Sequence, residues 1–178
     1  MADAAALFGL EGRTILIVGG GQGMGEASVR LLASLGANVA VLDLDLERAE
    51  RVAADAAAAG VRALPIAADV TDAAAAIEAV ARAERELGPL HGMAAIVGMA
   101  AWSNVLDMTE EVWDLDHRRN LRYFFVAARE VARNLIARRA PGSIVAVSSV
   151  DGLRSAANHA SYGAAKAGLV NLTQTLAA

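Results

Sequence analysis

The sequence predicts an α/β fold, a doubly wound parallel sheet between two layers of helices in a three-layer α/β/α domain. Short apolar segments alternate with longer helical patterns along the 178 residues. The short segments are almost continuously apolar, which is typical of parallel strands buried on both faces. A glycine-rich segment joins the first of them directly to a helical pattern, as in a strand–turn–helix unit. We expect right-handed crossovers between the strands.

The predicted elements follow one another without a linker or repeat. Strands are expected at Arg13–Val18, Asn38–Asp43, Val61–Ala67, Met93–Val97 and Ser143–Ser148. Helices are expected at Gly23–Leu35, Leu46–Ala59, Asp72–Leu87, Glu110–Arg139 and Ser161–Ala177. Helix starts are indicated by Thr71-Asp72 and Thr109-Glu110, and helix ends by Gly36, Gly60 and Gly88-Pro89. The sequence therefore predicts one domain over residues 1–178.

Composition excludes several classes of function. The net charge is −4 and the pI about 5.4, so no nucleic-acid partner or anionic membrane surface is predicted. The chain has no cysteine, which excludes disulfides and thiolate chemistry and fits a reducing compartment. Met1–Leu10 lacks the basic start of a secretory signal, and the uncharged stretch Gly92–Trp102 is shorter than the roughly 20 residues of a membrane span. We expect a cytoplasmic protein with no membrane partner and no metal site.

A glycine loop follows the first predicted strand. It reads Val18-Gly19-Gly20-Gly21-Gln22-Gly23-Met24-Gly25. Glycines let the backbone approach a pyrophosphate closely, and the helix N-terminus supplies N–H donors. The spacing is Gly19-x-x-x-Gly23-x-Gly25, since Glu26 stands where a Gly-x-Gly-x-x-Gly pattern needs glycine. The loop predicts a Rossmann-like dinucleotide site with contacts from Gly19, Gly21, Gln22, Gly23, Met24 and Gly25; the alternative is a tight turn that binds nothing.

Acidic residues end the next two strands. Asp43 lies twenty residues after Gly23, where a carboxylate accepts hydrogen bonds from the adenosine ribose and repels a 2′-phosphate. Neither Gln22 nor Leu44 offers a cation for that phosphate, so NAD(H) is favoured over NADP(H). Asp69 and Val70 end the third strand and are predicted to reach the adenine. Helix capping is the alternative role for both Asp43 and Asp69.

Lys166 is the only lysine of the chain and stands four residues after Tyr162. Residues four apart share one face of a helix. A nearby cation favours phenolate and so lowers the pKa of a tyrosine hydroxyl, which is otherwise about 10. Lysine is also a compact donor that can reach a sugar hydroxyl. The alternative is a solvated lysine four residues after a tyrosine by chance.

Ser149 ends the fifth predicted strand, thirteen residues before Tyr162. With the glycine loop, Asp43 and Tyr162-x-x-x-Lys166, the chain resembles the short-chain dehydrogenase/reductase family, from Leu10 to Thr173. The resemblance implies a catalytic tetrad: Asn120 holds a relay water, Ser149 orients the substrate, Tyr162 is the acid/base, and Lys166 anchors the cofactor ribose. It also implies cofactor contacts from Gly98, Tyr162 and Lys166. Ser149 as a turn residue and Asn120 as a surface amide are the alternatives.

The chain departs from the family pattern in two places. Ala95-Ile96-Val97-Gly98 replaces Asn-Asn-Ala-Gly after the fourth strand, and Val18 replaces the threonine before the first glycine. Apolar packing between these neighbouring substitutions is expected to compensate. His159 is interpreted as a loop histidine, with substrate contact as the alternative. Core or interface roles are expected for Trp102, Trp113, Phe124 and Phe125, and a solvated helix face for Arg118-Arg119.

The resemblance also implies that the domain is truncated, because members usually continue past this point and add carboxyl-terminal strands that are missing here. A sheet of order 3-2-1-4-5 would then leave the outer face of the fifth strand uncovered. The implied activity is NAD(H)-dependent interconversion of a secondary alcohol and a ketone, in a homo-oligomer, tetramer or dimer. The alternative is a non-catalytic nucleotide-binding or oligomer-scaffold protein.

Overall fold

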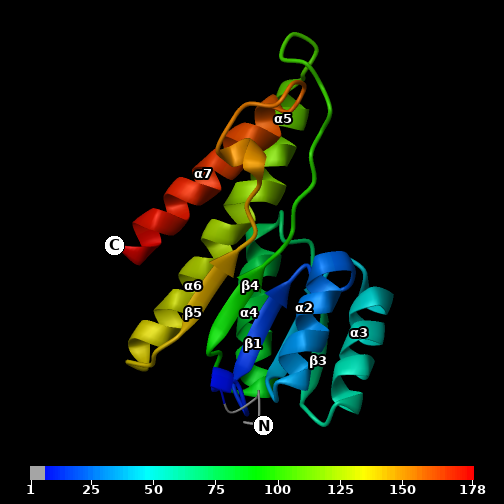
Figure 1. Cartoon of the computed structure of the whole chain (residues 1–178), viewed down its shortest axis with the longest axis vertical. Coiled ribbons are helices and arrows are strands. Elements are labelled where there is room, and N and C mark those ends of the chain that lie inside the picture. Colours follow the sequence, from blue (N-terminus) through cyan, green and yellow to red (C-terminus); the bar gives the residue numbers. More distant parts are fainter. Residues whose placement is uncertain (1–6) are drawn as a thin grey trace.

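A five-stranded parallel sheet forms the centre of the molecule (Figure 1). The computed structural model describes residues 7–178, so Met1–Ala6 of the amino-terminal segment lie outside the described residues. The strands are β1 (Thr14–Val18), β2 (Asn38–Asp43), β3 (Ala63–Ala67), β4 (Gly92–Ala95) and β5 (Ser143–Ala146). They pair in parallel in the order β3-β2-β1-β4-β5, as predicted.

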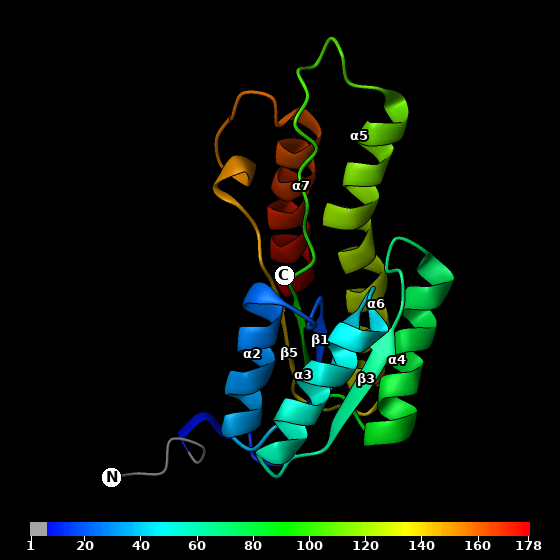
Figure 2. The same cartoon turned by 90° about the vertical axis from the view of Figure 1, so that its right-hand side faces the viewer.

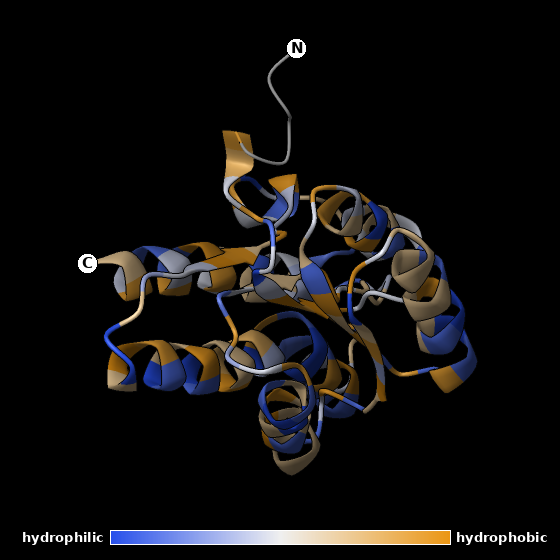
Figure 3. Ribbon diagram, turned by 90° about the horizontal axis from the view of Figure 1, so that it is seen from below, coloured by the Kyte–Doolittle hydropathy of each residue, from blue (hydrophilic) through white to orange (hydrophobic). Residues whose placement is uncertain are grey.

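Helices cover both faces of this sheet (Figure 2). They are α2 (Gly23–Ser34), α3 (Leu46–Ala58), α4 (Ala73–Leu87), α5 (Glu110–His117), α6 (Tyr123–Ala137) and α7 (Ala160–Ala177). The apolar residues of α2 and α3 pack on one face, against Ile17, Val39 and Val41. Those of α4, α6 and α7 pack on the other, against Leu16, Val18 and Leu42. The view along the molecule in Figure 3 shows apolar and polar residues alternating around these helices. The three-layer fold predicted from the sequence is confirmed.

The predicted helix Glu110–Arg139 is wrong in one respect, because a π-helical turn, η1 (Arg118–Arg122), interrupts it between α5 and α6. The Asn120 side chain explains the interruption. Its Nδ2 donates a hydrogen bond of 2.9 Å to the backbone oxygen of Asp116, one turn earlier. A side chain that takes over a helix carbonyl disturbs the backbone ladder, and π turns of this kind are frequent at functional sites.

Helix starts follow the sequence signals closely. Thr109 caps α5, and its hydroxyl accepts from the backbone N–H of Val112. Asp72 caps α4 through the N–H of Ala74. Asp45 caps α3 through the N–H of Arg48, so the alternative in which Asp43 is that cap is wrong. Asp43 is thus left available for another role.

β5 is the edge strand beside β4, and it alternates exposed with half-buried residues. Val145 is 58% exposed. It lies on the same face of the sheet as Ile17, where α2 and α3 pack on the other strands and leave β5 uncovered. The expectation of an uncovered face on the fifth strand is therefore confirmed. Within residues 7–178 no helix has the length and apolar character needed to cross a bilayer.

The glycine loop packs against the start of α2 so closely that Gly25 has no room for a side chain. A Cβ at this position would lie 1.8 Å from the backbone oxygen of Gly19. Relief would require the loop and the helix to move apart, since the obstructing atom belongs to the backbone. The geometry of the loop therefore depends on this glycine.

We predict that Gly25→Ala lowers the free energy of unfolding by at least about 3 kcal/mol, because the contact cannot be relieved by a side-chain rotation. Leu31→Ala on the same helix is the control: Leu31 is 60% exposed, and we expect a loss below about 1 kcal/mol. Urea unfolding followed by circular dichroism measures both. Equal losses in the two variants would contradict the prediction.

Candidate functional site

A cleft of about 630 Å³ lies at the carboxyl ends of β1, β2 and β4 and beside the segment that follows β3. Eight of the predicted cofactor residues line it: Gly19, Gln22, Gly23, Met24, Asp43, Asp69, Val70 and Gly98. Gly21 and Gly25 are buried behind this lining and shape the turn. The crevice outside the carboxyl ends of parallel strands is where ligands bind in open α/β sheets.

The N-terminus of α2 lies at this cleft, and its first backbone N–H groups are available as hydrogen-bond donors. Gln22 is its N-cap residue and makes no capping hydrogen bond through its side chain. The first backbone N–H groups of a helix have no partner inside the helix, and they favour an anion, as does the helix dipole. The loop thus leaves backbone donors of α2 at the cleft, and a phosphate site there stays a prediction.

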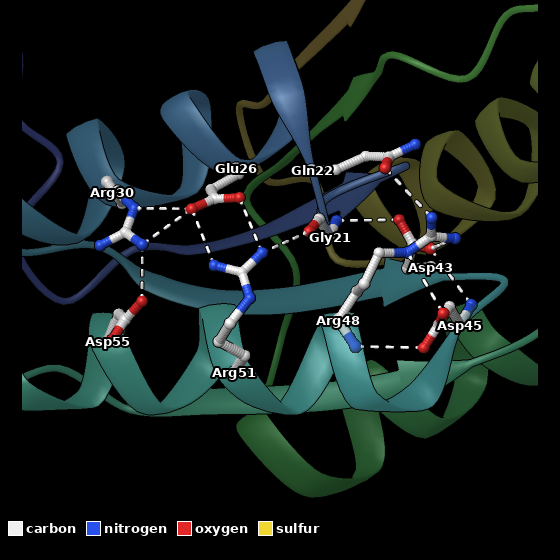
Figure 4. Close-up of polar contacts among 9 residues, drawn as sticks. All are labelled: Gly21, Gln22, Glu26, Arg30, Asp43, Asp45, Arg48, Arg51 and Asp55. Atoms are coloured by element: carbon white, nitrogen blue, oxygen red, sulfur yellow. Dashed lines mark hydrogen bonds and ion pairs between the residues drawn. The ribbon is translucent and has the colours of Figure 1, made fainter.

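Asp43 is the most heavily engaged carboxylate of the cleft, and it is only 7% exposed. Its Oδ2 accepts a hydrogen bond of 2.9 Å from the backbone N–H of Gly21. Its Oδ1 accepts from the N–H of Asp45 at 3.1 Å and from Nη2 of Arg48 at 2.9 Å. Figure 4 shows these contacts between the glycine loop and α3. Arg48 was missed by the sequence reasoning, which considered only Gln22 and Leu44 as neighbours of a 2′-phosphate.

Asp69 lines the same cleft as Asp43. Its Oδ1 accepts from the backbone N–H of Thr71 at 2.8 Å and from the Thr71 hydroxyl at 2.7 Å. Since Asp72 caps α4, the capping alternative for Asp69 is wrong. The carboxylate instead fixes the turn that carries Val70 to the wall of the cleft.

Asn120 is fully buried in η1. Its Oδ1 accepts from the backbone N–H of Met99 at 3.1 Å, and its Nδ2 donates to the Met99 carbonyl at 2.8 Å. The surface-amide alternative is therefore wrong. The amide fastens the π turn to the segment that follows β4, next to Gly98.

Lys166 is 2% exposed and lies inside the molecule rather than in solvent. Its Nζ donates to the carbonyl of Val147 at 2.9 Å and lies 5.7 Å from the centre of the Tyr162 ring. A Cβ on Gly98 would be 3.2 Å from both this Nζ and Asn120 Oδ1. Lys166 and Asn120 thus converge on the backbone of Gly98. Desolvation lowers the pKa of the Lys166 ammonium to about 8.

Ser149 and Tyr162 lie on neighbouring segments. Ser149 follows β5 and caps the short 3₁₀ helix η2 (Val150–Gly152), with its Oγ accepting from the N–H of Asp151 at 3.2 Å. η2 packs against α7, the helix that carries Tyr162. Among the described residues no hydrogen bond joins the Tyr162 hydroxyl to Ser149 or to Lys166. Ser148, the neighbouring serine, donates to the carbonyl of Lys166 at 3.3 Å.

The His159 side chain is held by contacts with Asp151 and Trp102, unlike that of a solvated loop histidine. Its Nδ1 lies 2.6 Å from Asp151 Oδ2, and both side chains are largely buried. Its ring centre lies 3.9 Å from that of Trp102 and 5.7 Å from that of Tyr162. Trp102 is 75% exposed, so of the two expected roles the core position is wrong and the interface role stays a prediction. Phe124 is fully buried in the core, as predicted.

Asp116 is a second buried group that the sequence reasoning missed. Its Oδ2 accepts from the hydroxyl of Ser161 at 2.5 Å and from the N–H of Ala101 at 3.2 Å. Its Oδ1 pairs with Arg119 at 2.5 Å, so the prediction of a solvated Arg119 is wrong. The carboxylate joins α5 to the residue before Tyr162. The signal available in the sequence was an aspartate one helical turn before Asn120.

Ala95–Gly98, the segment that stands where the family has asparagines, packs through apolar contacts as expected. Val18 pairs in register with Ala95, and both lie in the core cluster. The carbonyl of Val97 accepts from the buried hydroxyl of Tyr123 at 2.9 Å, and burial raises the pKa of Tyr123. Apolar contacts and one tyrosine hydroxyl therefore hold this segment.

Comparison with known proteins agrees with this geometry. The sequence profile described as short chain dehydrogenase matches residues 13–178. The chain belongs to this family. It is 36% identical over 168 residues to 2,3-dihydro-2,3-dihydroxybenzoate dehydrogenase of Bacillus subtilis, covering 94% of this chain and 64% of that protein. It is 37% identical over 169 residues to 2-(S)-hydroxypropyl-CoM dehydrogenase 3 of Xanthobacter autotrophicus, covering 95% and 66%.

Solved structures in the same family have the same fold. A Serratia marcescens short-chain dehydrogenase/reductase variant superposes with a TM-score of 0.87 at 33% identity, over 94% of this chain and 68% of that one. An NAD+-bound xylitol dehydrogenase superposes with a TM-score of 0.89 at 28% identity, over 94% and 64%. The chain spans about two thirds of the length of the curated relatives, 64% and 66% for the two named above.

The buried ammonium of Lys166 predicts a pH-dependent stability. The pKa of this ammonium is about 8 in the folded protein, whereas an unperturbed lysine has a pKa of 10.5. Between these values the unfolded chain holds a proton that the folded protein lacks, so the free energy of unfolding rises with pH from about 8 to 10.5. Below that window both states are protonated, and the penalty for the buried charge is constant.

Lys166→Met removes this titration. We predict that the variant's unfolding free energy, relative to the unaltered protein, decreases as pH rises through the window and is constant below it. Urea unfolding of both proteins at several pH values measures this difference. A difference that does not change with pH would contradict the burial of a charged lysine.

Proposed function

We propose that this chain carries the cofactor site and catalytic residues of an NAD(H)-dependent oxidoreductase that interconverts a secondary alcohol and a ketone. The observation that carries the proposal is the convergence of buried Lys166 and Asn120 on Gly98, at the edge of the nucleotide cleft and beside the ring of Tyr162. A buried cation next to a tyrosine, beside a strand-end cleft, is a recognisable acid/base arrangement.

The cleft fits a nicotinamide dinucleotide. The glycine loop and the uncapped start of α2 suit the pyrophosphate, Asp43 suits the adenosine ribose, and Asp69 with Val70 suits the adenine. Gly98 leaves room between Asn120 and Lys166, where a side chain would crowd both polar groups. When bound, the nicotinamide accepts or supplies the hydride.

The remaining chemistry belongs to the protein. In the oxidative direction Tyr162 takes the hydroxyl proton of the alcohol while the hydride leaves its carbon, and a ketone forms. In the reductive direction negative charge develops on the carbonyl oxygen. Ser149 donates a hydrogen bond to that oxygen and Tyr162 returns the proton. Lys166 favours the phenolate through its charge and anchors the nicotinamide ribose, and Asn120 holds a relay water.

NAD(H) is proposed as the preferred nucleotide because the Asp43 carboxylate accepts ribose hydroxyls and repels a 2′-phosphate. The substrate is proposed to be a small alcohol or ketone. A homo-oligomer, tetramer or dimer, is proposed to pack through α6 and α7. In support, Phe125, Ile136 and Leu176 on these helices are 43%, 75% and 51% exposed.

A second candidate is a non-catalytic nucleotide-binding or scaffold protein. It is favoured by the lost asparagines at Ala95 and Ile96. It is also favoured by a relative named inactive 2-(S)-hydroxypropyl-CoM dehydrogenase 2 of Xanthobacter autotrophicus, 39% identical over 155 residues. A fluorescence titration with NADH followed by a screen of simple secondary alcohols separates the two candidates. Binding without turnover of any alcohol would favour the second.

We predict that Tyr162→Phe abolishes turnover and leaves NADH affinity within about threefold, because the change removes only the hydroxyl that carries the proton. Initial rates and a fluorescence titration measure the two effects separately. Turnover equal to that of the unaltered protein would exclude the acid/base role. A parallel loss of NADH binding would point to misfolding instead.

The two adjacent serines give a matched pair of variants. We predict that Ser149→Ala lowers kcat by about 10² or more, as expected for the loss of a donor to the developing oxyanion. Ser148→Ala removes only the contact with the Lys166 carbonyl, and we expect a loss below about tenfold, which corresponds to one ordinary hydrogen bond. Steady-state kinetics of both variants measure the contrast. The reverse order would reassign the role to Ser148.

A further inference from the structure

Arg48 lies where the glycine loop, β2 and the first turn of α3 meet (Figure 4). Its Nη2 donates to Asp43 Oδ1 at 2.9 Å, and its Nη1 donates to Gln22 Oε1 at 3.1 Å. Its Nε is 3.6 Å from Asp45 Oδ2 and is buried without a hydrogen-bond partner. The side chain is 35% exposed and lines the nucleotide cleft. The guanidinium is thus held at the carboxylate proposed to bind the ribose.

Counting acceptor sites shows what Arg48 does to Asp43. An ionised carboxylate offers about four lone-pair positions on two oxygens. Oδ1 already accepts from Asp45 N–H and Arg48, and Oδ2 accepts from Gly21 N–H. About one position remains, whereas a ribose 2′,3′-diol presents two hydroxyl donors. Full engagement of the diol therefore requires Arg48 to withdraw from Oδ1.

The charge of Arg48 acts in the opposite sense on a 2′-phosphate. The guanidinium of Arg48 contacts Asp43, the carboxylate that would repel that phosphate, and so reduces the negative potential around this carboxylate. A guanidinium is also a good partner for phosphate oxygens, because its N–H donors form a planar fork. At Asp43, Arg48 thus disfavours binding of the ribose 2′,3′-diol and favours binding of a 2′-phosphate.

We propose that Arg48 sets the cofactor selectivity of this chain by occupying Asp43, and so narrows the preference for NAD(H) over NADP(H). The inference rests on the proposed function, since it concerns the nucleotide bound in the same cleft. Removal of Arg48 frees one acceptor position on Asp43 Oδ1 for the ribose and exposes the full charge of the carboxylate to a 2′-phosphate.

Arg51 provides a matched control one turn further along α3. It carries the same charge, but its partners are Glu26, at 2.8 Å, and the carbonyl of Gly21, at 3.1 Å. It makes no contact with Asp43 among the described residues and does not line the cleft. A variant at Arg51 changes the net charge of α3 as a variant at Arg48 does, without changing the acceptor sites of Asp43.

The experiment measures dissociation constants for NADH and NADPH by isothermal titration calorimetry at one salt concentration. The proteins are the unaltered chain, Arg48→Leu, Arg48→Lys and Arg51→Leu, each checked for folding by circular dichroism. We expect the NADPH/NADH ratio of dissociation constants to rise by at least about tenfold in Arg48→Leu, the size of one partly screened charge contact. We expect a change below about threefold in Arg48→Lys and Arg51→Leu.

The possible outcomes separate this inference from the function on which it rests. An unchanged ratio in Arg48→Leu, or an equal rise in Arg51→Leu, would overturn the selectivity role and leave the nucleotide site standing. Failure of the unaltered protein to bind either nucleotide would overturn both. If Arg48→Leu does not fold, Arg48→Gln replaces it, and the same rise in the ratio is required.

Discussion

Parallel pairing in the order β3-β2-β1-β4-β5 brings every strand's carboxyl end to the same edge of the sheet. Each segment that leaves this edge carries part of the site: the glycine loop after β1, Asp43 at the end of β2, Asp69 after β3, Gly98 after β4 and Ser149 after β5. The close contact between Gly25 and the carbonyl of Gly19 fixes the first of these segments. Residues far apart in sequence, such as Gly19, Asp43 and Gly98, therefore line one cleft.

Lys166 shows how burial and function combine in this arrangement. A buried ammonium is unfavourable unless it is hydrogen-bonded. Among residues 7–178 the Lys166 ammonium makes one hydrogen bond, to the Val147 carbonyl just after β5. Desolvation consequently lowers its pKa to about 8. An ammonium with a lowered pKa exchanges its proton more readily near neutral pH than a solvated lysine does. The buried Lys166 ammonium therefore lowers the stability of the folded protein.

Polar side chains hold the site in place, and most of them belong to no motif. Asp116 connects α5 to Ser161 at the start of α7, and Asn120 fastens the π turn to Met99. Asp151 orients His159 beside Tyr162. The Asp116 and Asp151 contacts join α5 and η2 to the start of α7, so the position of the tyrosine depends on two elements besides its own helix. The same holds at the other end of the cleft, where Arg48 reaches back from α3 to the end of β2.

The sequence by itself determined the fold class and the glycine-loop side of the cleft, because apolar periodicity, glycine spacing and helix caps are local signals. The strand order followed from the family resemblance. Asp43 lines the cleft as its place at a strand end predicts, and Gly98 lines it as the resemblance implies. Only the tertiary structure decided that Arg48 lies on Asp43, that Asp116 pairs with Ser161, and that a π turn breaks the long helix at Asn120. Each of these depends on where a side chain meets a group from another element or an earlier turn. Such meetings leave no periodic or spacing signal in the chain, since they are fixed by packing.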